Sequence, residues 1–207
     1  SHVAHVCEGE VKTGDTFKAV VDAKRREAIM RNHSVTHIMH KALREVLGEH
    51  VAQKGSLVND AVTRFDFHHD KPMTAEEIRQ VEDIVNAEIL ANTPVQCRVM
   101  SLADARTSGA TMLFGEKYGE TVRVLNIGTS VELCGGTHVA RTGDIGSFKI
   151  ISEAGISAGV RRVEAVTGLN AVRLMQDNAD LLATAAAKFK APAQELPEKI
   201  DHLGETV

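Results

Sequence analysis

Four residues with metal-binding side chains stand in two matched pairs. His33 and His37 are separated by three residues, and Cys134 and His138 repeat that spacing further along the chain. Three imidazoles and one thiolate form a ligand set that fills a tetrahedral zinc site. The two pairs together predict one zinc ion per chain, whereas either pair alone would be a weak indication.

The first pair falls in a segment with helical periodicity. Apolar residues recur at intervals of three and four over residues 35–47, which predicts an amphipathic helix. Asn32 is its expected N-cap and Gly48 its expected stop. The charged lead-in over residues 24–27 is expected to be a solvated surface, with a phosphate contact as the alternative.

The orientation of the histidines on this helix bears on their use. At about 100° per residue, His33 and His37 project from the side opposite the middle of the apolar stripe. The helix would then pack through one face and offer both imidazoles from the other. The alternative is a solvated face that carries histidines without binding a metal, because His40 and Arg44 also lie on it.

The second pair encloses two glycines. Gly135 and Gly136 lie between Cys134 and His138 and predict a tight turn rather than a helix. Such a turn can bring a thiolate and an imidazole to one point and leave backbone amides bare for a substrate. The alternative for Cys134 is a small buried apolar residue, which is the commonest fate of a free cysteine.

Composition sets the class of protein. The chain has 207 residues, of which 43% are hydrophobic and 25% charged, as in soluble globular proteins. Three cysteines and the lack of a long apolar run favour a reducing cytoplasm and no membrane contact. The net charge of −4 excludes binding to nucleic acid by bulk attraction, so any such contact must be focal.

The remaining segments predict an α+β fold, in which an antiparallel or mixed sheet carries helices on one face as a two-layer sandwich. A capping box, Thr74 with Glu77, should begin a second helix. A strand starting at Pro94 should bury Cys97. The other strands are expected at residues 62–67, 122–127, 148–152 and 160–166, and a third helix at 169–190.

Three regions are expected along the chain. Residues 1–22, with a strand at 17–22, would end a preceding β-domain. Residues 23–168 would form the zinc-containing domain. Residues 169–207 would be a helical extension that leads to a further C-terminal domain, and residues 191–207 would form its linker because Pro192 and Pro197 interrupt them.

The motifs together resemble a known family. The two ligand pairs are similar to those of the editing domain shared by alanyl-tRNA synthetases and the free-standing alanyl-tRNA editing proteins, with a related domain in threonyl-tRNA synthetase. Residues 31–37, 53–58 and 152–162 resemble the bacterial alanyl-tRNA synthetase in particular. The resemblance covers roughly residues 10–190, and the segment after it favours a fragment of the synthetase over a free-standing editor.

The resemblance implies hydrolysis of tRNA(Ala) that carries serine or glycine. A small apolar site for alanine cannot strongly reject a residue that differs by one hydroxyl, so a second, hydrolytic site is needed. The implied partners are the acceptor end of the mischarged tRNA and the remainder of the synthetase chain, which would hold the ATP-dependent activity.

The resemblance also implies roles for individual residues. His33, His37, Cys134 and His138 would bind Zn²⁺, and Thr36 and Gln53 would act in catalysis. The substrate would contact Thr36, Gln53, Ser56, Gly135, Gly136 and Arg161. Read without the resemblance, Thr36 could bond back to its own helix, Gln53 and Ser56 could serve a turn, and Arg161 and Arg162 could be surface residues.

Some choices stay open in the sequence. Four protein ligands are usual for a structural zinc site, so zinc could activate water or only organise the pocket, with water placed by Thr36, Gln53 or backbone amides. A zinc-stabilised RNA-binding module without activity and a free-standing editor are the rival functions. A metalloprotease is disfavoured because Ser34 stands where the HExxH glutamate would be.

Overall fold

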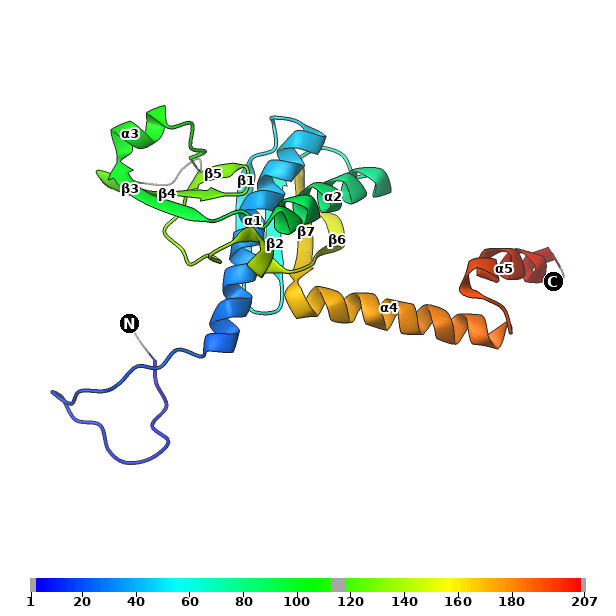
Figure 1. Cartoon of the computed structure of the whole chain (residues 1–207), viewed down its shortest axis with the longest axis horizontal. Helices are drawn as coiled ribbons and strands as arrows, with labels where there is room; N and C mark the ends of the chain where they lie inside the picture. The colour runs from blue at the N-terminus through cyan, green and yellow to red at the C-terminus, as the bar shows by residue number, and fades with distance from the viewer. Residues whose placement is uncertain (1–2, 113–117, 206–207) are drawn as a thin grey trace.

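The computed structural model describes residues 3–112 and 118–205 (Figure 1). Helices and strands are interspersed along these residues, with two short 3-10 helices labelled η. In chain order the elements are α1 (Ala23–Leu47), β1 (Gln53–Val58), β2 (Thr63–His68), α2 (Ala75–Ala91), β3 (Gln96–Ser101), α3 (Leu102–Thr107), β4 (Thr121–Ile127), β5 (Ser130–Leu133), η1 (Thr142–Ile145), β6 (Phe148–Ser157), β7 (Val160–Thr167), α4 (Gly168–Lys188), η2 (Ala193–Glu195) and α5 (Leu196–Glu205).

A four-stranded antiparallel sheet and two helices form the main body. The strand order is β1-β2-β7-β6, and α1 and α2 pack against each other and against this sheet. Alternate residues of β2, such as Phe65 and Phe67, are buried in the core with Val35 and Leu43 of α1. The predicted two-layer α+β class with a C-terminal helical extension is confirmed.

A second sheet holds the strands that lead to Cys134. It is antiparallel with the order β3-β4-β5, so the expectation of one sheet is wrong for the described residues. Strand periodicity reveals an extended segment but not its partner. The expected burial of Cys97 is also wrong, because β3 is an edge strand on which Cys97 is exposed and Val99 is 71% exposed.

Helix α1 begins at Ala23, twelve residues before its apolar stripe. The carboxylate of Asp22 accepts a hydrogen bond from the Arg25 amide at 3.0 Å and caps the helix. The predicted cap at Asn32 is therefore wrong, because the charged lead-in is itself a good helix former. The predicted stop at Gly48 is confirmed, and so is the capping box that begins α2, in which Thr74 and Glu77 bond reciprocally.

The two ends of the chain differ from expectation. Residues 3–22 are exposed and form no strand, so the strand predicted at 17–22 is wrong; no described segment lies beside it to pair with its backbone groups. Residues 193–205 form η2 and α5 where a linker was expected, and Pro197 fits the first turn of a helix. Figure 1 shows α4 extending away from the body. None of the described helices is long and apolar enough to span a membrane.

Candidate metal centre and its cavity

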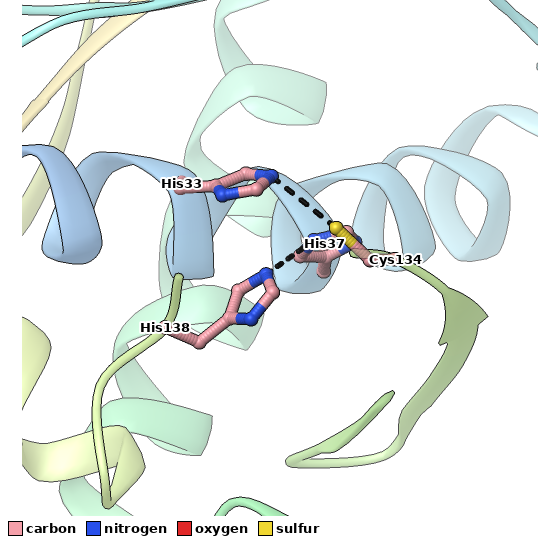
Figure 2. Close-up of side chains that lie close together, drawn as sticks. All are labelled: His33, His37, Cys134 and His138. Atoms are coloured by element: carbon pink, nitrogen blue, oxygen red, sulfur yellow. Dashed lines mark hydrogen bonds between the residues drawn. The ribbon is translucent and has the colours of Figure 1, made fainter. Parts of the chain in front are cut away.

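The two predicted ligand pairs meet at the middle of α1. His33 and His37 project from adjacent turns of α1, and Cys134 and His138 come from the loop after β5 (Figure 2). One ligand atom from each residue lies within 4.8 Å of the other three. The sequence pairs were 97 residues apart, so the fold itself creates this cluster.

The distances fit a tetrahedral ion. Nε2 of His37 and Nε2 of His138 are 3.2 Å apart, and Sγ of Cys134 is 3.5 Å from Nε2 of His33. Zinc bonds of about 2.0 to 2.3 Å at tetrahedral angles would place such ligand atoms about 3.4 to 3.6 Å apart. The group can therefore hold one metal ion without moving its side chains far.

The loop from β5 approaches α1 closely at Gly136. A Cβ atom there would come within 2.1 Å of Cε1 of His33, so no other residue fits without displacing the imidazole. The hydroxyl of Ser34 accepts a hydrogen bond from the Val139 amide at 3.0 Å and ties the end of the loop to the helix. Arg123 of β4 also donates to the carbonyl oxygen of Gly136. Ser34, which stands where a metalloprotease would have its HExxH glutamate, thus has a structural partner in the loop.

A buried carboxylate behind the cluster was missed in the sequence. Glu132 of β5 accepts hydrogen bonds from Nδ1 of His37 at 2.5 Å and from Nδ1 of His40 at 2.9 Å. Because a carboxylate of this kind only accepts, it fixes the proton of His37 on Nδ1 and leaves Nε2 free for a metal. Strand alternation could have revealed Glu132, since it lies two residues before Cys134 and so faces the same side.

The cluster also shifts the protonation of its members. Burial alone would raise the pKa of Cys134, but hydrogen bonds from His138, His33 and His37 outweigh it and lower the pKa to about 3. Burial would lower the pKa of His37, but Cys134 and Glu132 raise it to about 9. Burial would raise the pKa of Glu132, but His37 and His40 lower it to about 2. Cys134 is therefore a thiolate at neutral pH, which is the form that binds metals.

A cavity of about 480 Å³ opens beside the metal cluster and is lined by three of its four residues, His33, His37 and Cys134. Its size is that of a small-ligand site. Four of the residues predicted to act on the substrate line it: Thr36, Gln53, Ser56 and Gly135. Its wall also contains His40, Phe65, Arg123 and Glu132, none of which the sequence had singled out as site residues. Gly136 and Arg161 are not among the described residues that line it.

Thr36 and Gln53 already have partners within the chain. The Thr36 hydroxyl donates to the carbonyl of Asn32 at 2.8 Å, and Oγ1 of Thr63 lies 2.6 Å from it. The amide of Gln53 donates to Oγ of Ser56 at 3.3 Å. Thr36 thus makes the hydrogen bond to its own helix that was expected as the alternative, and it also lines the cavity. The roles of these residues in catalysis and binding stay predictions.

The two arginines of β7 are held by carboxylates. Arg161 donates two hydrogen bonds to Glu153, and Arg162 donates two to Asp66. These hydrogen bonds raise the pKa of both guanidinium groups. A contact between Arg161 and tRNA stays a prediction. Arg123 has no carboxylate within salt-bridge distance among the described residues, and its guanidinium donates to Gly136 and to Sγ of Cys97 at 3.0 Å.

Comparison with known proteins shows which proteins the chain resembles in sequence. Residues 122–164 match the threonyl and alanyl tRNA synthetase second additional domain, a segment that contains Cys134 and His138. The alanine–tRNA ligase of Polynucleobacter asymbioticus is 60% identical over 206 residues, which are 100% of this chain and 24% of the ligase. The ligases of Delftia acidovorans and Bordetella pertussis are 64% and 62% identical over 93% and 95% of this chain, and 22% of each ligase is covered.

These matches confirm the resemblance to bacterial alanyl-tRNA synthetase that the motifs indicated. The chain is a region related to a tRNA synthetase, and it spans about a quarter of the length of the curated relatives that it matches.

Proposed function

We propose that this chain hydrolyses the ester of tRNA(Ala) mischarged with serine or glycine. The observation that carries the proposal is that four metal-binding side chains converge beside a cavity that His33, His37 and Cys134 line, in a chain similar to alanine–tRNA ligases. A cavity of about 480 Å³ suits an amino acid and part of a ribose. Selection of alanine by size alone leaves serine and glycine errors, which a hydrolytic site removes.

We further propose Zn²⁺ as the metal, held by His33, His37, Cys134 and His138. One thiolate with three imidazoles is a donor set that zinc accepts readily. When bound, zinc would supply Lewis-acid stabilisation of the ester oxygen or a lowered pKa for water. Glu132 would keep His37 in the tautomer that presents Nε2 to the metal.

The residues of the chain supply the positioning. Gln53, Ser56 and Thr36 contribute polar side chains to the lining of the cavity, and Gly135 contributes backbone. An aminoacyl ester is labile, so correct placement of water against its carbonyl carbon could supply much of the rate. Gly136 supports the site from behind, because it lets the loop close on His33.

The proposed partners are the acceptor end of tRNA(Ala) and the rest of a synthetase chain in the cytoplasm. In this view residues 1–22 and 169–207 join residues 23–168 to neighbouring domains. We propose Arg123, at the cavity, as a phosphate contact in addition to Arg161. Loss of one phosphate contact should reduce the slope of log affinity against log salt by about 0.7 for a single-stranded end. Comparing this slope for Arg123→Ala and Arg161→Ala identifies which arginine contacts a phosphate.

The deciding experiment compares deacylation of seryl-, glycyl- and alanyl-tRNA(Ala) by the chain with zinc content measured in parallel. We expect seryl- and glycyl-tRNA to be hydrolysed much faster than alanyl-tRNA, and Cys134→Ala to lose both zinc and activity. The matched control, Cys97→Ala, alters an exposed cysteine outside the metal cluster and should retain both. Zinc-loaded protein that binds all three tRNAs equally and hydrolyses none would instead indicate an RNA-binding module.

A further inference from the structure

His40 is a buried imidazole on the cavity with one nitrogen unused. It lies one helical turn beyond Thr36 on α1 and is 3% exposed. Its Nδ1 donates to Glu132 at 2.9 Å, and its ring rests against Phe65 with centroids 5.0 Å apart. Its Nε2 has no hydrogen-bond partner among the described residues, although the residue lines the cavity.

An unpaired nitrogen in this position indicates a ligand. Buried polar atoms are almost always hydrogen-bonded, and leaving one without a partner costs free energy. Because Nδ1 of the neutral ring donates to Glu132, Nε2 is left as a buried acceptor without a donor among the described residues. His40 lines the cavity, so a molecule bound there is the nearest source of such a donor.

Thr36 is less suited to read a hydroxyl on the substrate. Its own proton goes to the Asn32 carbonyl, and its oxygen also meets Thr63. A serine hydroxyl could use only the remaining acceptor capacity of that oxygen. His40, on the same side of α1, offers a whole unused lone pair instead.

We propose that His40 is a specificity-determining residue whose Nε2 accepts a hydrogen bond from the serine hydroxyl of the aminoacyl ester. This inference rests on the proposed editing function and names how its substrate is chosen. It also accounts for glycine: with no side chain in the way, a water molecule can occupy the same space and donate to Nε2. The methyl group of alanine would displace that water and leave Nε2 unpaired, so alanine is disfavoured.

Two amide substitutions each imitate one of the two nitrogens of the ring. In His40→Asn the amide takes the place of Nδ1 and keeps the contact with Glu132, but nothing replaces Nε2. In His40→Gln the amide reaches the place of Nε2. We expect His40→Asn to lower the seryl-to-alanyl and glycyl-to-alanyl rate ratios about tenfold, and His40→Gln to keep them within about threefold. His50→Leu, which alters an exposed histidine away from the cavity, is the matched control.

Two outcomes would contradict a role of His40 in specificity. If both variants retain zinc and the wild-type ratios, His40 reads no substrate group. If all three rates fall by the same factor, His40 acts only through Glu132 and His37 as a structural support.

A binding measurement keeps this test apart from the proposed function. Stable amide analogues, 3′-deoxy-3′-aminoadenosine carrying seryl or alanyl groups, report selection without hydrolysis. We expect the wild-type chain to bind the seryl analogue about tenfold more tightly, and His40→Asn to bind both alike. Failure of hydrolysis with this preference intact would reject the editing proposal for the chain but not the role of His40. Equal binding of both analogues by the wild-type chain would reject the role of His40.

Discussion

The two longest helices, α1 and α4, use their side chains in opposite ways. The middle of α1 is buried on its polar side as well as its apolar side, because the loop after β5 and the second sheet cover the face that holds the histidines. The buried residues of α1 are Asn32, Ser34, Val35, Thr36, His37, Ile38, Met39, His40, Ala42 and Leu43. In α4 only Ala171 and Ala186 are buried, while Leu181 is 69% exposed.

The difference shows that an apolar stripe does not by itself identify a core helix. Helix α4, which the sequence predicted over residues 169–190, is also amphipathic, yet it extends from the body (Figure 1) and most of its leucines are in contact with solvent. The buried polar residues of α1 look like a solvated face in the sequence, yet each has a partner elsewhere in the fold. Asn32, for example, donates to the carbonyl of Asn59 at 2.8 Å and accepts from Thr167 at 2.6 Å.

The largest expected effect is the loss of the zinc ion proposed to bind on the polar side of α1. Cys134→Ala removes one of four ligands and should reduce bound zinc from about one equivalent to a small fraction, since a complete structural zinc site contributes on the order of 10 kcal/mol. Elemental analysis after dialysis measures it. Cys97→Ala should keep its zinc. Full occupancy in both Cys134→Ala and His37→Ala would show that this cluster is not the metal site.

The apolar sides of the two helices can be compared with the same substitution. Leu43→Ala in α1 should lower the free energy of unfolding by about 2–5 kcal/mol, because the side chain is fully buried and leaves a cavity. Leu181→Ala in α4 should change it by less than about 0.5 kcal/mol. Denaturant titrations of both variants measure the difference. Similar losses would mean that α4 is covered in solution, and the contrast between the helices would fail.

Substitution of Glu132, the carboxylate that accepts hydrogen bonds from two histidines of α1, should have a smaller effect on zinc binding. Glu132→Gln keeps the shape but weakens the hydrogen bonds that orient His37 and His40. We expect zinc affinity to fall by about 10- to 100-fold with the fold retained, as for other groups that support metal ligands. Competition with a zinc chelator measures it. Glu49→Gln, an exposed residue outside the cluster, is a suitable control, and equal affinities in the two variants would contradict the role of Glu132.

Local patterns predicted the elements well and their partners poorly. The apolar stripe of α1, the capping box of α2 and the strands over residues 63–68, 121–127, 148–157 and 160–167 follow from periodicity and cap chemistry. Cys97 was misplaced because alternation marks the two faces of a strand but not which one is covered. The strand expected at 17–22 failed for a related reason, since a strand needs a neighbour that sequence does not name.

The candidate site divides in the same way. The four metal-binding residues could be named from spacing and residue type, because these alone define a ligand set. The roles of His40 and Glu132 do not follow from spacing, since they depend on the contact between α1 and β5. The arginine pairs of β7 were equally hidden, because Arg162 meets Asp66 only through the register of two strands distant in sequence.

The smallest expected effect is a pH-dependent change in melting temperature. It compares Asp66, in the main body, with Asp177, on α4. Hydrogen bonds from Arg162 lower the pKa of Asp66 below the usual range of an aspartate, although burial opposes this. A lowered folded-state pKa means that the pair stabilises the fold above that value and loses its effect as pH falls through the lowered pKa. Asp66→Asn should therefore lower the melting temperature at pH 7, and its difference from wild type should shrink below about pH 4.

The matched change on α4 is Asp177→Asn. Asp177 is exposed and is joined by no ion pair within the described residues, so its melting temperature should stay near that of wild type at both pH values. Calorimetric scans of wild type and both variants at pH 7 and pH 3 measure the pattern. A difference for Asp66→Asn that is unchanged at low pH would show that its effect does not come from the charge of the carboxylate, because protonation removes that charge from the wild-type chain as well.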